Sequence, residues 1–399
     1  MPESGRDHRK MHPLRGPGRG ALLTGIVFLV FLTGLSGCRN GSQKAEEIRL
    51  GLIASLSGEM AQSGTSASQA ARLKVKAVNS SGGLLLGGRK YVLKLLVEDD
   101  RDNPQTAVAA AQKLINQKGI AALIGPMASR NAIPVARVAE KAFVPMISPV
   151  STHPDTTAGK NYVFRAAATD SFQGKVLGEF AFNDLGMTRA AVLFDAAGAY
   201  NQTLAKVFRS EFRALGGEVT GFEFYTTGEE DFRDQLRRIG RSEPDLLFLP
   251  NYPPDVVRQV EQARELGLTC LILGSDGWGT MSAEGFAAVG EAYFSNLWAP
   301  DPADDRNRVF IEAYQKAYDR SPDSLAALTY DSVSLLVEAI KSQGRADSRA
   351  IREGLAQTRD FQGLAGSISY EKGGDPIKSV AIMALREGKP VFFKSFAPD

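Results

Sequence analysis

One serine, Ser129, lies at a position where a protein chain could bind an anion. Ser129 follows the apolar segment 121–124, and a helical stretch should begin soon after it, near Asn131. The hydroxyl and the neighbouring backbone N–H groups would then lie at a helix N-terminus, where the helix dipole favours carboxylates. The simpler interpretation is a helix-capping serine, and the two roles are compatible.

A second candidate group lies in a glycine-rich segment, Gly274-Ser275-Asp276-Gly277-Trp278-Gly279. The segment looks like a phosphate-binding loop, but it lacks the Lys-Ser/Thr pair that such a loop needs. Asp276 supplies its only charge. A carboxylate in a closed site must be paired with a cation or stay hydrated, so Asp276 is either one half of a charge pair with a ligand or an ordinary turn residue.

The sequence offers little material for catalysis. Two of its three histidines, His8 and His12, lie in the N-terminal leader, which leaves His153 for the rest of the chain. A single histidine leaves almost no material for Ser/His or Cys/His catalysis or for histidine-based metal sites, and a nucleophile could be paired with a histidine only near His153. We therefore expect that the protein is not an enzyme and that it has no metal site and no cofactor.

The acidic run from Glu98 to Asp102 could suggest a calcium loop. It lacks the glycine and the terminal glutamate that EF-hand spacing requires. A role at the edge of a cleft is simpler, with Asp102 or Asn103 capping the helix that Pro104 opens.

The N-terminal residues have the pattern of an export signal. A basic leader precedes an apolar run from Ala21 to Leu32, which is shorter than the ~20 residues of a membrane-spanning helix. The run ends at Leu35-Ser36-Gly37-Cys38, which resembles a lipobox. The resemblance implies a signal peptide over 1–37, a lipid anchor on Cys38 and a tether over 38–46. The alternatives are an ordinary secretory signal with a chance cysteine, or an uncleaved anchor.

Charge and cysteine content limit the classes of partner and the disulfides that the chain could have. The chain has 47 Lys and Arg residues against 45 Asp and Glu residues, and cleavage before Cys38 would remove five of the basic and two of the acidic residues. A nearly neutral chain without a dense basic block argues against nucleic acid as a partner. Only Cys270 would then keep a side-chain thiol, so the chain cannot form an internal disulfide.

Short apolar runs alternate with longer stretches at helical period, which is the pattern of βαβ units and parallel sheets. The length suits two lobes of ordinary domain size. The predicted strands are 48–53, 91–97, 121–124, 144–147, 162–165, 190–194, 219–225, 245–249, 270–273, 366–370, 380–385 and 391–393. The main predicted helices are 66–79, 104–118, 307–318, 325–341 and 348–357.

Six short motifs follow one another along the chain. They are Leu56-Ser57-Gly58-Glu59-Met60-Ala61-Gln62-Ser63-Gly64, Asn79-Ser80-Ser81-Gly82-Gly83, Glu98-Asp99-Asp100, Ile124-Gly125-Pro126-Met127-Ala128-Ser129, Ile147-Ser148-Pro149-Val150-Ser151-Thr152 and Asp170-Ser171-Phe172-Gln173-Gly174. In this order and spacing they resemble the leucine/isoleucine/valine-binding family of periplasmic binding proteins. Each motif alone is weak, but six of them in family order and spacing are specific. The resemblance covers nearly all of the chain after Cys38 and fades toward the C-terminal strands.

The resemblance implies an α/β fold of two doubly wound parallel-sheet lobes joined by a three-stranded hinge, the type 1 periplasmic-binding fold. Lobe 1 would comprise 47–165 and 299–362, and lobe 2 would comprise 166–298 and 363–399. The crossings are expected near Arg165, Trp298 and Gly363. Ligands of open α/β sheets bind at the carboxyl ends of the strands, so the site should lie in the cleft between the lobes.

The resemblance also implies a role for each site residue in lobe 1. Ser129 would bind the carboxylate of an amino acid. In the segment Val150-Ser151-Thr152, Val150 would offer its backbone carbonyl, and Thr152 would offer its hydroxyl and amide. The alternative for this segment is a turn built around Pro149 and Pro154.

In lobe 2 the resemblance implies that Asp276 pairs with the ligand ammonium, although its side chain is one methylene shorter than the family's usual glutamate. Tyr200 and Tyr252 match the aromatic residues that lie against the ligand, where tyrosine offers both an apolar face and a hydroxyl. For Tyr252, which precedes two prolines, packing at a helix start is the alternative.

Ser63 is the main departure from the family pattern, which often has a large aromatic residue at this position. A serine leaves that wall of the site open and polar. An apolar side chain gains about 25 cal/mol per Å² only where its surface becomes dry. Ser63 therefore puts a strictly branched-chain aliphatic ligand in doubt and favours a larger or more polar amino acid.

The function implied by the resemblance is that of an extracytoplasmic solute-binding protein. It would bind an amino acid or a similar small molecule by closing its lobes, and deliver it to the permease and ATPase subunits of an ABC importer. It would reside in the cell envelope, anchored by lipid. One alternative is a ligand-sensing receptor domain that feeds a signalling system, and another is a hydrolase, which would need a nucleophile paired with a base.

Overall fold

The computed structural model describes residues 45–300 and 304–398. The expected signal peptide, the anchor residue Cys38 and residues 38–44 of the tether lie outside this range. The described residues belong to one unit, Ala45–Asp399, and are considered by themselves. Among them, no helix combines the length and the apolar character needed to cross a bilayer.

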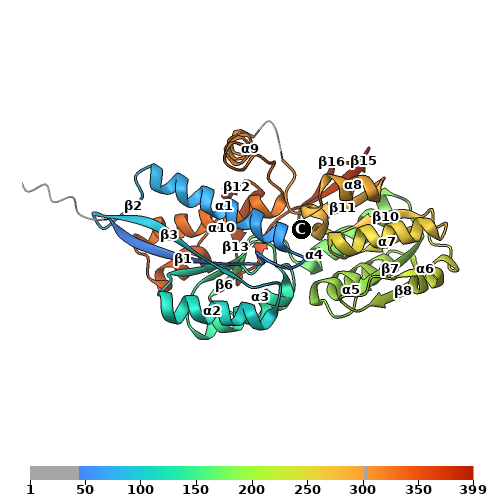
Figure 1. Cartoon of the computed structure of the whole chain (residues 1–399), viewed down its shortest axis with the longest axis horizontal. Coiled ribbons are helices and arrows are strands. Elements are labelled where there is room, and N and C mark those ends of the chain that lie inside the picture. Colours follow the sequence, from blue (N-terminus) through green and yellow to red (C-terminus); the bar gives the residue numbers. More distant parts are fainter. Residues whose placement is uncertain (1–44, 301–303, 399) are drawn as a thin grey trace, which may run out of the picture. The chain divides into compact units, whose positions relative to one another are not determined.

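Lobe 1 is built on a six-stranded sheet with the order β2-β3-β1-β4-β5-β6 (Figure 1). Neighbouring strands pair parallel except at β2, which forms an antiparallel pair with β3. The strands are β1 (Glu46–Ala54), β2 (Leu84–Leu86), β3 (Arg89–Asp99), β4 (Ala122–Ile124), β5 (Met146–Ser148) and β6 (Val163–Arg165).

Helices enclose this sheet, which explains its almost continuous apolar strands. In β1, the side chains of Leu50, Leu52 and Ile53 are fully buried on both faces. The helices are α1 (Ala61–Ser80), α2 (Pro104–Lys118), α3 (Ser129–Lys141), α9 (Asp305–Tyr318), α10 (Ser324–Gln343) and α11 (Ser348–Ala356). Helix α1 packs on α9 and α10, and α2 packs on α3.

Helix α2 begins and ends as its sequence predicts. The side chain of Asn103 accepts hydrogen bonds from the backbone N–H groups of Gln105 and Thr106, Pro104 occupies the first turn, and Gly119 ends the helix in the left-handed conformation with φ of 58°. Of the two candidate caps, Asn103 is therefore the cap. Asp102 is left free for another contact.

Lobe 2 is built on a seven-stranded sheet with the order β16-β15-β11-β10-β9-β7-β8. Its centre is parallel, and β15 and β16 add an antiparallel edge. The strands are β7 (Arg189–Asp195), β8 (Glu218–Tyr225), β9 (Leu246–Leu249), β10 (Leu271–Gly274), β11 (Ala292–Asn296), β15 (Val380–Arg386) and β16 (Lys389–Phe396). The two parallel-dominated sheets confirm the predicted fold class.

The helices of lobe 2 connect these strands. They are α4 (Asp170–Glu179), continued as a π-helical turn over Phe180–Asp184, α5 (Ala199–Ala214), α6 (Arg233–Gly240), α7 (Pro253–Glu265) and α8 (Ala283–Val289), with a 3-10 turn at Asp276–Thr280. Glycine ends both α5 and α7, because Gly216 and Gly267 adopt positive φ values of 104° and 79°.

A small third sheet, made of β12 (Phe361–Gly363), β13 (Gly366–Tyr370) and β14 (Pro376–Ile377), packs on lobe 1. The Tyr370 hydroxyl donates to the backbone oxygen of Arg165 at 2.8 Å, and its ring lies 5.2 Å from that of Phe164. The backbone N–H of Arg165 donates to Gly374 O at 2.9 Å.

These contacts favour a third crossing later than the expected Gly363. We expected lobe 2 to resume at Gly363, but the sheet of lobe 2 receives the chain only at β15. We therefore propose that lobe 1 extends to Ile377. The strand-like pattern of 366–370 fits either sheet, and only its tertiary contacts assign it.

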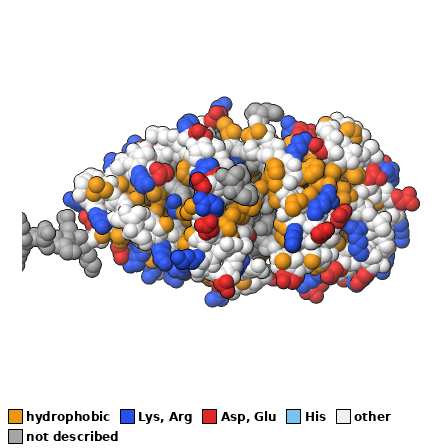
Figure 2. Space-filling view, turned by 90° about the horizontal axis from the view of Figure 1, so that it is seen from above, with side chains coloured by type: hydrophobic (Ala, Val, Ile, Leu, Met, Phe, Trp, Pro, Cys, Tyr) orange, Lys and Arg blue, Asp and Glu red, His pale blue; other side chains and the backbone are white. Residues whose placement is uncertain are grey.

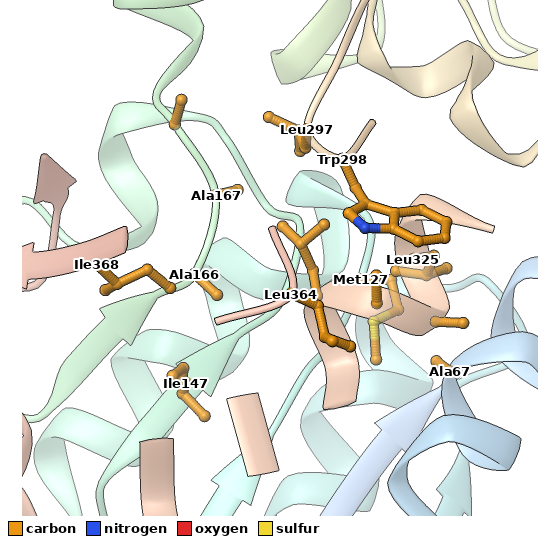
Figure 3. Packing of buried hydrophobic residues seen from close by; sticks show 14 of the residues in the cluster. Ala67, Met127, Ile147, Ala166, Ala167, Leu297, Trp298, Leu325, Leu364 and Ile368 are labelled. Atoms are coloured by element: carbon orange, nitrogen blue, oxygen red, sulfur yellow. The ribbon is translucent and has the colours of Figure 1, made fainter. Parts of the chain in front are cut away.

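The core is continuous through the crossings between the lobes (Figure 3). Trp298, on the second crossing, lies close to Leu325 of α10. Ala166 and Ala167, on the first crossing, belong to the same apolar cluster. On the outer face drawn in Figure 2, acidic and basic side chains are interspersed, in keeping with the nearly equal numbers of the two charges.

Candidate functional site

A cavity lies at the carboxyl ends of strands from both sheets. Its empty volume is about 500 Å³, which includes open solvent at its mouth. Six of the eight expected ligand-binding residues line it. They are Ser63, Ser129, Val150, Tyr200, Tyr252 and Asp276. The remaining lining residues are Met60, Met127, Ala128, Gly277, Thr280, Leu297, Ser324 and Leu325.

Ser129 is the first residue of α3, and Ala128 rather than Ser129 occupies the N-cap position. The interpretation of Ser129 as a simple capping residue is therefore wrong, and α3 begins two residues before the expected Asn131. Ser129 is buried, with an exposed fraction of 1%. Its hydroxyl lies at the positive end of the helix, in the wall of the cavity.

Ser151 lies behind Ser129 rather than in the cavity wall. The Ser151 hydroxyl donates to Ser129 Oγ at 3.0 Å, and it also lies 2.7 Å from Thr156 Oγ1. Because Ser151 has a single hydroxyl proton, Thr156 must be the donor in the second pair. Ser129 thus accepts from behind, and its own proton remains available to an anion in the cavity.

Tyr200 and Asp276 form the polar wall of lobe 2. The Tyr200 hydroxyl donates to Asp276 Oδ1 at 2.8 Å and accepts from the backbone N–H of Gly277 at 3.0 Å. Ser275 Oγ lies 2.7 Å from the same hydroxyl and must be the donor, because the tyrosine proton is already used. These three hydrogen bonds fix the Asp276 carboxylate relative to α5.

Tyr252 extends this wall with its aromatic ring. The ring stacks on that of Tyr200 with a centroid separation of 5.3 Å and an interplanar angle of 25°. Tyr252 is also the N-cap residue of α7, followed by Pro253. The two interpretations of Tyr252 therefore coincide, since one residue starts the helix and lines the cavity.

Burial is the main influence on the Asp276 carboxyl and raises its pKa to about 6, while hydrogen bonding from Tyr200 acts in the opposite direction. A carboxylate held this way gains most from a cation that enters the cavity with it. The geometry therefore suits recognition of an ammonium group.

A second carboxylate, Asp170, was assigned no role by the sequence although it opens one of the six motifs. It is fully buried at the start of α4, and neither of its carboxylate oxygens has a hydrogen-bond partner among the described residues. Burial raises its pKa well above the usual range, and the negative charge of Asp276 raises it further. The two carboxyl groups are therefore electrostatically coupled, although only Asp276 lines the cavity.

Thr152 lies beside Asp170 rather than in the cavity wall. Its backbone oxygen accepts from the Asp170 N–H at 2.9 Å. Its hydroxyl faces the Asp170 carboxyl, yet it has no partner that satisfies hydrogen-bond geometry within the described part of the chain. Buried polar atoms are normally satisfied, so the unpaired Thr152 hydroxyl and the Asp170 carboxylate next to it make this region a candidate polar binding site.

Arg165 fixes the loop that carries Val150 and Thr152. Its buried guanidinium donates to the backbone oxygens of Ser151 and His153, both at 2.8 Å, and pairs with Asp375 at 2.6 Å. Because Asp375 lies just before the third crossing, one side chain connects the ligand loop with two of the crossings. The loop is therefore rigidly positioned by the hinge region.

Ser63 lies in a part of the cavity wall that also borders an outer groove. Gly64 lets α1 approach the end of β1 closely, since a Cβ added there would lie 1.9 Å from Ser55 O. Met60, Ser63 and Thr280 line both the inner cavity and an outer groove with an empty volume of about 1090 Å³. Ser63 is buried, with an exposed fraction of 6%, and lies where the cavity borders that groove.

Comparisons with known proteins agree with this architecture. Residues 47–390 match the periplasmic binding protein family. A Leu/Ile/Val-binding protein of Rhizobium johnstonii is 30% identical over 333 residues, covering 82% of this chain and 89% of the relative. A leucine-, isoleucine-, valine-, threonine- and alanine-binding protein of Pseudomonas aeruginosa is 26% identical over 344 residues, covering 86% and 90%.

Solved structures show the same relationship. The leucine-binding protein LivK of Thermotoga maritima is 30% identical with a TM-score of 0.81, covering 88% of this chain and 99% of that one. The substrate-binding protein LivJ of Streptococcus pneumoniae, in complex with isoleucine, is 28% identical with a TM-score of 0.81, covering 88% and 100%.

Proteins of this family are extracytoplasmic and bind solutes rather than catalyse reactions. The match spans both lobes and the crossings between them. The chain belongs to the leucine/isoleucine/valine-binding family of periplasmic binding proteins.

Proposed function

We propose that this protein captures a free amino acid between its two lobes. The observation that carries the proposal is the pairing of opposite electrostatic surfaces across one cavity. Ser129 and the N-terminus of α3 offer hydrogen-bond donors and positive potential from lobe 1, while Asp276 offers a negative charge from lobe 2. A zwitterion is the small molecule that satisfies both surfaces at once.

In this proposal the ligand carboxylate accepts from Ser129, and the Val150 carbonyl and Thr152 support the two ends of the zwitterion. The ammonium pairs with Asp276, and its charge compensates a carboxylate that burial otherwise drives toward protonation. Tyr200 and Tyr252 cover the ligand with their rings. The names of the relatives, which specify amino acids with aliphatic side chains and threonine, support this class of ligand.

The opening at Ser63 supports a ligand with a larger or more polar side chain than leucine. Ser63 and Thr280 line the inner cavity with hydroxyl groups, and both also line the outer groove. An aliphatic side chain directed there would keep water contact and lose part of its burial energy. A longer side chain with a polar end would lose less.

The test is a thermal-shift panel on protein lacking residues 1–38, followed by calorimetry. The panel contains aliphatic, polar and long-chain amino acids, short-chain amides and aromatic acids. We expect stabilisation by α-amino acids, and no response to the same compounds after N-acetylation, which removes the ammonium charge. Preference for a compound that has no ammonium group would contradict the proposal.

Delivery to the permease and ATPase subunits of an ABC importer is the proposed biological context, supported by the transporter named for the isoleucine complex. A receptor domain that feeds a signalling system is the alternative. The two differ in a labelled-ligand uptake assay, because deletion of this protein abolishes uptake only in the first case.

We further propose that Cys38 carries the lipid anchor, on the strength of Leu35-Ser36-Gly37-Cys38. Cys38→Ala should move the protein from the membrane fraction to the soluble fraction. Cys270→Ala is the matched control and should leave it in the membrane fraction. Continued membrane retention of the Cys38 variant would rule out the anchor.

A further inference from the structure

The residue next to Ser129 makes a contact between the lobes. Arg130 is the second residue of α3 in lobe 1, and its guanidinium carbon lies 5.4 Å from the centroid of the Tyr252 ring in lobe 2. This separation is within the range of a cation–π interaction. At one helix terminus, Ser129 thus lines the ligand cavity, and its neighbour Arg130 contacts the opposite lobe.

Lobe 1 orients Arg130 independently of this contact. Its Nη2 atom pairs with Asp102 Oδ2 at 2.5 Å, and both side chains are largely buried, with exposed fractions of 24% and 11%. Asp102 lies in the turn between β3 and α2, where Asn103 rather than Asp102 caps the helix. Asp102 is therefore free to fix the guanidinium.

The contact continues to the proposed ligand site. The Tyr252 ring stacks on Tyr200, whose hydroxyl donates to Asp276. Lobe 2 also presents Asp195 to the positive charge of Arg130. A chain of contacts thus runs from Asp102 through Arg130 and the two tyrosines to the carboxylate that faces the cavity.

We propose that Arg130 is a positioning residue that stabilises the closed arrangement of the lobes and holds the Tyr252 ring against the bound ligand. The inference rests on the proposed capture of an amino acid by lobe closure. Because Arg130 and Tyr252 belong to different lobes, their contact is available to the closed arrangement and is lost when the lobes separate. Arg130 touches the ligand only through Tyr252.

The test is a double-mutant cycle between Arg130→Gln and Tyr252→Leu, with ligand affinity and dissociation rate as readouts. A partly desolvated cation–π contact predicts an increase in Kd of about 3- to 30-fold for Arg130→Gln, mostly through faster dissociation. The two changes should be strongly non-additive. Tyr252→Phe keeps the ring, so Arg130→Gln should increase Kd by the same factor in the Tyr252→Phe background as in the wild type.

Two further variants separate positioning from folding. Asp102→Asn should weaken binding in the same direction, since it removes the charge that orients Arg130. Arg137→Gln changes an exposed arginine of the same helix and is the matched control. All variants are compared by circular dichroism and by small-angle scattering, with and without ligand. Arg130→Gln should scatter as a more open particle at subsaturating ligand and in ligand-free protein.

Additive effects in the cycle, or an unchanged Kd and unchanged scattering for Arg130→Gln, would overturn the positioning role. Failure of the proposed function looks different, because the wild type itself would then bind no amino acid. In that case the ligand-free scattering of the wild type and Arg130→Gln still decides whether the contact favours closure.

Discussion

The hydroxyl of Tyr200 donates a hydrogen bond of 2.8 Å to Oδ1 of Asp276. Tyr200 belongs to α5 and Asp276 follows β10, so the carboxylate in the cavity is held by two separate elements of lobe 2. Each of the following predictions tests one consequence of this site or of the fold that supports it.

Asp276→Asn should weaken amino-acid binding by at least about 30-fold, because it removes one partner of a buried charge pair. The amide oxygen can still accept from Tyr200, so the wall of the cavity is retained. Isothermal titration calorimetry measures the change. Asp255→Asn is the matched control, since Asp255 accepts from the Tyr225 hydroxyl and is not a cavity-lining residue. Equal affinities for the wild type and the Asp276 variant would exclude the ammonium contact.

Binding should depend on pH. Burial raises the pKa of Asp276 to about 6 in the ligand-free protein, and the ammonium requires the ionised carboxylate. Affinity should therefore fall as the pH drops below about 6, by up to about tenfold per pH unit. Calorimetry in buffers of different ionisation enthalpy should detect proton release on binding near pH 5.5. Affinity that stays flat between about pH 4.5 and 7.5 would contradict this.

The same pKa predicts an effect on stability. The folded protein holds the Asp276 proton more tightly than the unfolded chain, whose pKa is near the usual 3.8. The free energy of unfolding of the ligand-free protein therefore loses this contribution as the pH rises from about 4 to about 6. Asp276→Asn should raise the melting temperature at pH 7 and lose that advantage at pH 4, as measured by thermal denaturation.

Ser129→Ala should reduce affinity by roughly 10- to 150-fold, the usual range for a hydrogen bond to a charged group. Ser151→Ala should have a smaller effect, because Ser151 only directs the Ser129 hydroxyl from behind. Calorimetry distinguishes the two variants. A larger loss for Ser151 than for Ser129 would reverse the assigned order of contacts.

Ser63→Trp should close the gap between the inner cavity and the outer groove. Affinity for amino acids with long side chains should fall relative to affinity for alanine, because the larger ring occupies the path of the side chain. Competition binding with a graded series of side-chain lengths measures the ratio. Gln62→Trp is the control, since Gln62 lines the outer groove but not the cavity.

Much of the fold could be predicted from the sequence because local signals agree with it. Asn103, Pro104 and Gly119 define α2 without tertiary help. The apolar runs of β1, β4 and β10 are buried on both faces, so their composition alone indicates parallel strands. Lobe 2 was harder to predict where its parallel centre meets the antiparallel edge strands. The strand β11 was not predicted, and its pairing with β15 joins residues that are far apart in sequence.

The candidate site also has some features that the sequence predicts and others that only the tertiary structure decides. The sequence by itself determined which strand ends carry Ser129, Tyr200 and Asp276, since residue type and the preceding apolar run are local properties. Only the tertiary structure coupled the charge of the buried Asp170 to that of Asp276 and placed Arg130 against Tyr252, and it supports our proposal of a third crossing later than Gly363. These relationships join distant segments, and their energies depend on burial and charge that arise only when the lobes are assembled.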